Sequence, residues 1–304
     1  MTARRSGEFA WIAKHFAPLA GEGAFALADD AALWRPAGPT VLTQDTIVEG
    51  VHFFGDDPSE DVARKAVRVN VSDVVAKGAL PEALLLSLGV PDRWRDEDVA
   101  RFADGLGDDL RRYGLSLLGG DTTRSPERLS ITVTMLGQPL GRYVGRGGAK
   151  EGDLVFVCGP VGDATLGLRL RGTAGAEPFE RRQRVPDVRT DAARLVADHA
   201  TAAMDVSDGL VGDLGKLCAA SGVRAEIDLA AMPLSADARK RGVSREERIA
   251  MATGGDDYVV LMTASPDHPP PGLEPIGRIV AGKGVGVFLD GVPVEIARPS
   301  FTHD

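Results

Sequence analysis

Hydrophobic and polar residues alternate in several short runs, and these runs predict β-strands. The clearest is 129–136, where Leu129, Ile131, Val133 and Met135 alternate with serine and threonine, as in a strand with one covered face. Runs rich in leucine or β-branched residues predict further strands at 40–43, 84–88, 115–118, 154–158, 225–229 and 258–263. The segment 284–294 predicts a hairpin, because Asp290-Gly291 suits a tight turn.

Apolar residues at helical spacing predict helices between these strands. One begins with Ser59 as N-cap and ends by Gly78, and another carries a stripe from Val99 to Tyr113 and ends at Gly114. Further helices are predicted at 190–200 and around Leu210, Leu214, Leu217 and Cys218, with a polar loop at 171–188. The order of strands and helices predicts a mixed α/β (α+β) fold.

A glycine- and charge-rich segment divides this pattern. At 304 residues the chain is too long for one ordinary core, which favours two lobes with a cleft between them. The segment 137–153 has neither helical nor strand periodicity and is typical of a domain junction. We therefore predict two domains, residues 1–140 and residues 141–304.

Composition limits the class of protein. No apolar run approaches the roughly 20 residues that span a bilayer, and the N-terminus lacks the features of a secretory signal, so we expect a cytoplasmic protein without a membrane segment. Cys158 and Cys218 lie in apolar contexts and are interpreted as reduced core thiols. A net charge of -9 argues against nucleic-acid binding. An acidic protein can still bind a phosphorylated ligand if divalent cations supply the positive charge.

Five short acidic signatures are candidates for that chemistry. Each follows a predicted strand or apolar run, where binding residues concentrate: 29–30, 43–46, 70–73, 119–123 and 205–209. The short aspartate side chain suits the strict octahedral geometry of magnesium. Any one aspartate could equally be a helix cap or a solvated loop residue.

Structural alternatives stay open for each signature. Gly119-Gly120 before Asp121 lets a phosphate approach the backbone, or marks a tight turn. Ser207 or Asp208 could cap the following helix, whereas Asp205 has no helix of its own to cap. Asp73 lies near the negative end of a helix dipole, which a metal ion or water would relieve.

Two further segments could bind a ligand. His52 is either a half-buried core residue or part of a site. The paired glycines of 253–258, TGGDDY, allow close approach of a ligand or simply lead into a strand. The chain has no GxxxxGK[ST] loop, no kinase HRD or DFG arrangement, no GxGxxG after a strand and no HExxH, which disfavours the common nucleotide folds.

In this order, the signatures resemble the thiamine-monophosphate kinase family, whose superfamily includes aminoimidazole ribonucleotide synthetase and selenophosphate synthetase. The resemblance runs from Gly7 to the C-terminus, and its most specific stretches are DTIVEGVHF, NVSD, GGDTTR, GRGGAKEGD, DVSDGL and GGDDY. It implies two α/β lobes, with N-terminal sheets pairing in a homodimer and the nucleotide held between lobes. It also implies direct phosphoryl transfer from ATP to thiamine monophosphate, giving thiamine diphosphate and ADP.

The resemblance also assigns residues. It implies magnesium ligation by Asp30, Thr43, Asp45, Asp73, Asp121, Asp205 and Asp208. It implies ATP contacts from Gly120, Asp121, Arg146 and Ser207, and contacts to the thiamine phosphate substrate from His52, Asp256 and Phe301. No covalent or general-base residue is expected, because the acceptor phosphate is already an anion.

Three positions depart from the family pattern. Ala28 replaces a usual glycine, Gln44 a usual serine or threonine, and Asp256 a usual glutamate. Gln44 is therefore left off the ligand set, and the shorter Asp256 makes the substrate contact the weakest part of the assignment. Two rivals stay open: a sibling enzyme that activates an amide or carboxylate oxygen with ATP, and a non-catalytic nucleotide or metal sensor.

Overall fold

The computed structural model describes residues 6–301, and contacts between residues divide the chain into two units. Unit 1 comprises the chain up to Val74 together with Leu80–Gln138, and unit 2 comprises Val75–Ala79 and the chain from Pro139 onward. The short segment 75–79 groups with unit 2 because it packs there: the ammonium of Lys77 donates a hydrogen bond to the carbonyl of Ala203 at 3.0 Å.

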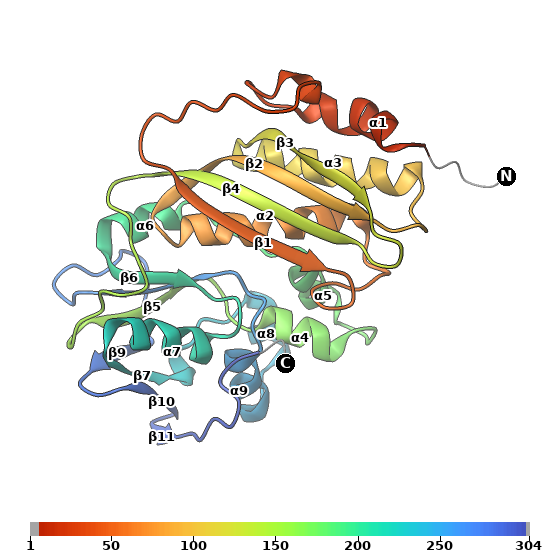
Figure 1. Ribbon diagram of the computed structural model, residues 1–304. Helices are drawn as coiled ribbons and strands as arrows, with labels where there is room; N and C mark the ends of the chain where they lie inside the picture. The colour runs from red at the N-terminus through yellow and green to blue at the C-terminus, as the bar shows by residue number, and fades with distance from the viewer. Residues whose placement is uncertain (1–5, 302–304) are drawn as a thin grey trace. The chain divides into compact units, whose positions relative to one another are not determined.

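Unit 1 is built on a four-stranded sheet in the order β1-β4-β2-β3 (Figure 1). Strand β1 runs antiparallel to β4, and β2 runs parallel to β3. The main elements are β1 (Val41–Val48), α2 (Ser59–Val75), β2 (Ala79–Val90), α3 (Asp96–Tyr113), β3 (Ser116–Arg124) and β4 (Ser130–Pro139). Before them come α1 (Glu8–Trp11) and short helical turns at Ile12–Phe16, Ala17–Leu19 and Phe25–Leu27.

The core of unit 1 lies between the sheet and helices α2 and α3, which run along one face of it (Figure 1). The alternation predicted for β4 is confirmed, since Ile131, Val133 and Met135 are fully buried. The predicted end of α3 is also confirmed, at a left-handed Gly114. The N-cap prediction for Ser59 is wrong: this residue is already helical, and its buried hydroxyl has no hydrogen-bond partner among the described residues.

Unit 2 is built on a seven-stranded sheet in the order β11-β10-β7-β9-β5-β8-β6. Strands β7 and β10 pair in parallel. The β10–β11, β5–β8, β5–β9, β6–β8 and β7–β9 pairs are antiparallel. Its strands are β5 (Leu154–Cys158), β6 (Ala200–Asp205), β7 (Arg224–Asp228), β8 (Val260–Ala264), β9 (Gly277–Val280), β10 (Gly284–Leu289) and β11 (Val292–Pro293). Its helices are α4 (Asp163–Leu170), α5 (Glu177–Arg184), α6 (Ala192–His199), α7 (Leu210–Ser221), a turn at Leu229–Ala231, α8 (Ala236–Arg241) and α9 (Arg245–Gly254).

Most elements predicted for unit 2 are present, with one clear error. The hairpin is confirmed, and its turn has left-handed φ angles of 54° at Asp290 and 74° at Gly291. The predicted loop 171–188 instead contains α5. Five of the eight residues of this helix are charged and only Phe179 and Gln183 are buried, so its sequence has too few apolar positions to show a helical period.

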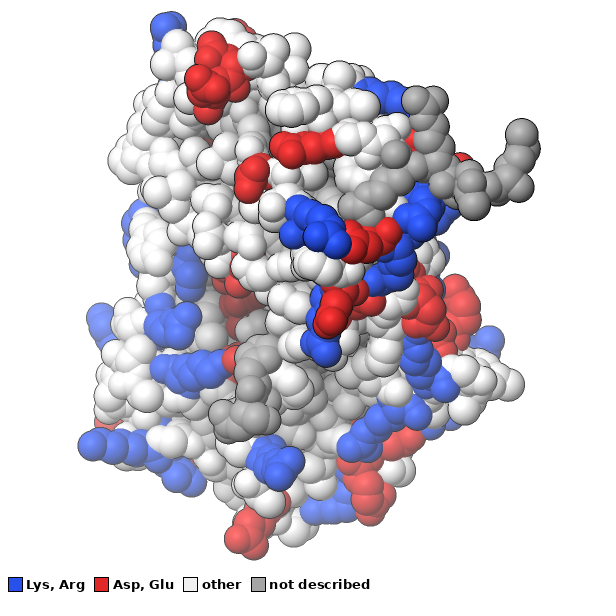
Figure 2. All heavy atoms as spheres, turned by 45° about the vertical axis from the view of Figure 1, so that its right-hand side comes forward, with Lys and Arg blue, Asp and Glu red and all other residues white. Residues whose placement is uncertain are grey.

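Charged side chains of both signs are interspersed over the face that Figure 2 shows. Many form ion pairs, such as Arg64 with Asp61 and Asp108 along α2 and α3. Exposed pairs of this kind contribute only about 0.2–1 kcal/mol each, so the two buried cores dominate the stability of the fold. None of the helices formed by residues 6–301 has the length and hydropathy needed to cross a membrane.

Candidate active site

Three of the five magnesium ligands predicted in unit 1 meet on the inner face of β1 and the last turns of α2, whereas Asp30 and Asp121 lie elsewhere in the unit. The hydroxyl of Thr43 donates to Asp73 Oδ2 at 2.6 Å, and the Asp45 amide donates to Asn70 Oδ1 at 3.0 Å. Strand alternation turns Gln44 to the opposite face, where its side-chain oxygen accepts a hydrogen bond from Thr134 at 2.7 Å. The structure therefore brings Thr43, Asp45 and Asp73 together and leaves Gln44 outside.

The carboxyl groups of Asp45 and Asp73 lie close enough to hydrogen-bond each other. Burial, the charge of Asp73 and this hydrogen bond raise the pKa of Asp45 to about 6. Two carboxylates so close favour a shared positive charge, either a proton or a cation. With the Thr43 hydroxyl they form a set of oxygen donors of the kind that Mg²⁺ prefers.

A cavity of about 540 Å³ lies in unit 1 between the N-terminal segment and the outer face of the sheet. Asp30 and Asp121 both line it, together with Gly119-Gly120 and an apolar wall that includes Trp34. The tight-turn alternative for this glycine pair is wrong, because both residues lie within β3. A side chain at Gly120 would place its Cβ 1.7 Å from the Leu86 carbonyl oxygen, so strand packing alone requires glycine there.

The half-buried His52 belongs to a turn that follows β1. Its Nδ1 accepts a hydrogen bond from the Val48 amide at 3.0 Å, which leaves the proton of the neutral ring on Nε2. The fully buried Lys65 donates to the His52 carbonyl at 2.9 Å. The turn is thus held from both the strand and α2, and the position of His52 is well defined.

In unit 2, two loops bind each other through their backbones. The Asp256 amide donates to the Ser207 carbonyl at 2.7 Å, and the Tyr258 amide donates to the Val206 carbonyl at 2.8 Å. A Cβ on Gly255 would lie 2.4 Å from the Ser207 oxygen. The predicted substrate loop and the predicted metal and nucleotide loop therefore form one structure.

Backbone strain is concentrated in the same place. Asp256 and Tyr258 have left-handed φ angles of 67° and 52°, next to Gly255 at 76°. Non-glycine residues in this region cost of order 1–3 kcal/mol and persist where surrounding contacts enforce them, often at functional sites. Asp205 ends β6 next to these loops and is 7% exposed.

Asp208 is held at the start of α7. The capping alternative for Ser207 and Asp208 is wrong, because Gly209 is the N-cap and makes no side-chain cap. The Asp208 carboxylate instead forms an ion pair with Lys216, and the Asp208 carbonyl accepts a hydrogen bond from the Phe301 amide at 2.9 Å. Phe301 is 51% exposed, so the predicted aromatic contact lies beside the predicted ligand loop with its ring accessible.

Arg146 lies on the open edge of β6. The Gly145 carbonyl accepts a hydrogen bond from the Ala203 amide at 2.9 Å. A Cβ on Gly148 would lie 2.5 Å from the Thr201 oxygen, so beyond Gly145 this segment runs towards the start of β6 and away from Asp205. Arg146 is exposed, and its contact with ATP stays a prediction.

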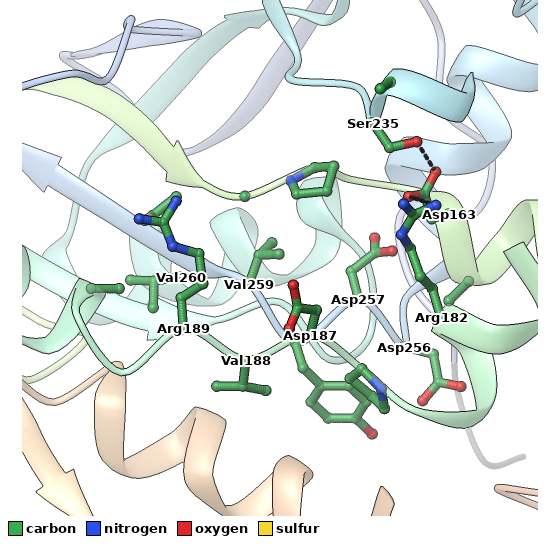
Figure 3. Close-up of a pocket in the computed structure, with 18 residues that line it drawn as sticks. Asp163, Arg182, Asp187, Val188, Arg189, Ser235, Asp256, Asp257, Val259 and Val260 are labelled. Atoms are coloured by element: carbon green, nitrogen blue, oxygen red, sulfur yellow. Dashed lines mark hydrogen bonds and ion pairs between the residues drawn. The ribbon is translucent and has the colours of Figure 1, made fainter. Parts of the chain in front are cut away.

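A second cavity, of about 240 Å³, lies beside Asp256 in unit 2 (Figure 3). Asp256 and Asp257 point away from each other on its wall, and Asp163 accepts a hydrogen bond from Ser235 at 2.8 Å beside Arg182. Burial raises the pKa of Asp163 and raises that of Asp257 well above its usual value. Sequence reasoning missed Asp163, Arg182 and Ser235 because each is an isolated polar residue far from the others along the chain.

The metal assignment remains a proposal. Within 6–301, no three or more His, Cys, Asp or Glu side chains converge to hold a metal ion. Asp45 and Asp73 pair in unit 1, whereas Asp205 and Asp208 belong to unit 2. Both sets nevertheless suit a cation, because Asp45 and Asp73 lie against each other in the first and Asp208 forms an ion pair with the Lys216 ammonium in the second.

Comparisons with known proteins give a consistent family. Residues 28–138 match the AIR synthase related protein N-terminal domain, and residues 150–290 match the corresponding C-terminal domain. Thiamine-monophosphate kinase of Caulobacter vibrioides is 37% identical, with 97% of this chain and 90% of that protein covered.

Solved structures agree with the sequence matches. Thiamine-monophosphate kinase from Stenotrophomonas maltophilia superimposes with a TM-score of 0.79 at 34% identity, over 88% of this chain and 91% of that one. AaThiL complexed with AMPPCP and TMP superimposes with a TM-score of 0.78 at 34% identity, over 99% and 100%. The fold class and the family resemblance predicted from the motifs are confirmed. The chain belongs to the AIR synthase related proteins and, among them, to the thiamine-monophosphate kinase family.

Proposed function

We propose that this protein transfers the γ-phosphoryl group of ATP to thiamine monophosphate, giving thiamine diphosphate and ADP. The observation that carries the proposal is the similarity, over 99% of the chain, to a kinase solved with AMPPCP and TMP. The backbone coupling of the 205–209 and 254–258 loops supports it, because nucleotide and acceptor must be held in a fixed relation for transfer.

The reaction requires alignment more than acid–base chemistry. A phosphate oxygen of thiamine monophosphate attacks the γ-phosphorus, the bond to the β,γ-bridging oxygen breaks, and ADP leaves with that electron pair. The attacking oxygen is already deprotonated, so no side chain has to remove a proton. The residues of this chain serve to bind and orient two anions that repel each other.

We assign the nucleotide to the cavity of about 540 Å³ in unit 1. Its apolar wall, with Trp34, Leu27 and Phe16, suits a purine base, and Gly120 and Asp121 suit the polyphosphate end. Arg146 and Ser207 of unit 2 stay predicted ATP contacts. His52 with its proton on Nε2, Asp256 and Phe301 are the proposed contacts to thiamine monophosphate.

Magnesium is the proposed cofactor. The proposed ligands are Asp30, Thr43, Asp45, Asp73 and Asp121 in unit 1 and Asp205 and Asp208 in unit 2. When bound, Mg²⁺ would neutralise negative charge on the two phosphate groups. It would so lower the free-energy barrier to bringing ATP and thiamine monophosphate together. A cytoplasmic location stays a prediction of the sequence.

We also propose a homodimer formed through the sheet of unit 1. Leu42, 65% exposed, lies on the outer face of the sheet in its edge strand β1, outside the residues that line the cavity. An apolar sheet face of this kind is typical of an interface. Sedimentation equilibrium should give twice the chain mass, and Leu42→Asp should shift the protein towards monomer; a wild-type monomer would contradict the proposal.

The kinase assignment is tested by incubating the protein with Mg-ATP and thiamine monophosphate and separating the thiamine phosphates by chromatography. Thiamine diphosphate should form with equimolar ADP. Asp121→Asn should abolish turnover, whereas Asp104→Asn, the same change at an exposed site on α3, should not. ATP binding without thiamine diphosphate formation would contradict the assignment and leave a nucleotide sensor.

A further inference from the structure

One lysine holds together the carboxylates at the start of α7. Lys216 Nζ donates to Asp208 Oδ2 and, at 2.7 Å, to Asp213 Oδ1. The Asp213 side chain is 0% exposed, whereas those of Asp208 and Lys216 are 33% and 40% exposed. The ammonium therefore bridges a buried carboxylate and one that faces solvent.

The same cluster fixes the main chain of the loop. Asp213 Oδ2 accepts a hydrogen bond from the Asp208 amide at 2.9 Å. A buried carboxylate requires a cation or several donors, and Lys216 with the Asp208 amide meets that requirement. Both the backbone and the side chain of Asp208 are thus positioned by the Lys216–Asp213 pair.

We propose that Lys216 is a positioning residue that occupies the Asp208 carboxylate when no divalent cation is present and releases it when one binds. The inference rests on the proposed function, because it takes Asp208 as a magnesium ligand. An ammonium and a divalent cation compete for the same carboxylate and repel each other at short range. Lys216 therefore keeps the loop ordered and lowers the cation affinity of the nucleotide-free protein.

The expected change in cation affinity follows from the solvent exposure of the Lys216–Asp208 ion pair. A partly exposed ion pair contributes up to about 1 kcal/mol, which is about fivefold in an equilibrium constant. Lys216→Met should therefore bind a divalent cation about threefold to fivefold more tightly than the wild type. Lys216→Arg keeps the charge and should stay within about twofold of the wild type.

The test uses the full chain without nucleotide and Mn²⁺ as the probe, with free Mn²⁺ measured by electron paramagnetic resonance. The same Lys216→Met change is also made in an Asp208→Asn background, where the gain in affinity should disappear. This double-mutant cycle separates competition at Asp208 from a general change in surface charge. A purely structural role would lower thermal stability and leave Mn²⁺ affinity unchanged.

Three results would overturn the inference: Mn²⁺ binding by Lys216→Met that is equal to or weaker than the wild type, no detectable binding by either, or the same gain in the Asp208→Asn background. If Lys216→Met loses its near-ultraviolet circular dichroism, Lys216→Gln replaces it with the same expected gain. Turnover of thiamine monophosphate is measured separately. A chain that shows the affinity gain but forms no thiamine diphosphate would contradict the proposed function alone.

Discussion

The two units hold their predicted magnesium carboxylates in opposite electrostatic settings. In unit 1, Asp45 and Asp73 lie against each other, and the pKa of Asp45 rises to about 6 through burial and that neighbour. In unit 2, Asp208 and Asp213 share the ammonium of Lys216. The first pair lacks positive charge that a cation would supply, whereas the second cluster carries its own. Cation binding should therefore relieve repulsion in unit 1 and displace an ion pair in unit 2.

The largest expected effect comes from removing one carboxylate of the unit 1 pair. Asp73→Asn should lower kcat by roughly 100-fold or more, the size seen when one preorganised electrostatic contact is lost. It should also raise the melting temperature of the metal-free protein, because the repulsion with Asp45 disappears. Asp104→Asn is the control for both measurements. Turnover within tenfold of the wild type would remove Asp73 from the proposed ligands.

The next effect tests how strongly the unit 2 site depends on backbone packing. Gly255→Ala should reduce the free energy of unfolding in urea by about 2–4 kcal/mol, through left-handed strain and a Cβ only 2.4 Å from the Ser207 oxygen. Gly242→Ala also has a positive φ, 79°, outside the αL region but nothing within 4 Å, so it should cost only about 1–2 kcal/mol. Equal losses would show that the two loops are not tightly coupled.

A smaller effect measures what Lys216 contributes to stability. In EDTA, Lys216→Met should lower the free energy of unfolding by about 1–2 kcal/mol, because the buried Asp213 loses its cation. This loss is smaller than for a fully buried ion pair, since the Lys216 side chain is 40% exposed. Lys240→Met, at an exposed position of α8, should change it by less than about 0.5 kcal/mol. No difference between the two variants would contradict the ion-pair assignment.

The smallest effect concerns Asp257, a buried carboxylate whose neighbours within 6–301 include other aspartates instead of the lysine that Asp213 has. Burial raises the pKa of Asp257 in the folded state, so the folded chain holds this proton more tightly than the unfolded chain. Its contribution to stability is then present at low pH and is lost as pH rises above about 4, the unfolded value.

Asp257→Asn removes that loss and can still accept the hydrogen bond from the Gly162 amide. The stability of the variant relative to the wild type should increase between about pH 4 and pH 7 in urea unfolding. Asp267→Asn, at an exposed turn, should show no such trend. A constant difference between Asp257→Asn and wild type across this range would contradict the role of burial.

The sequence identifies the candidate residues but places several of them in the wrong secondary structure. The acidic signatures are expected at the ends of strands and apolar runs, and Asp205 at the end of β6 fits that expectation. Thr43, Asp45 and Asp121 lie inside strands instead, and Asp73 lies inside α2. Strand β1 has polar residues on its inner face and therefore lacks the apolar alternation from which strands are predicted. For this reason the sequence predicts a strand that ends before Asp45, although β1 continues to Val48.

The sequence does not show which carboxylates are buried or which cation each one contacts. Asp213 lies in the helix that the sequence predicts after Asp208, yet only the fold shows that Asp213 is fully buried and bound to both Lys216 and the Asp208 amide. The cavity of Figure 3 likewise joins Asp163, Arg182 and Ser235 from three different helical regions. Burial and partner choice arise from contacts between distant segments, which single-residue patterns do not encode.

By itself, the sequence determined the α/β class, most strands and helices, and the family, because these follow from local periodicity and from short motifs that stay together along the chain. The tertiary structure decided which carboxylates lie against each other and which share a lysine, and why particular glycines are required. Electrostatic free energy depends on the distance and burial of each charge, and both are properties of the packed molecule rather than of the residue.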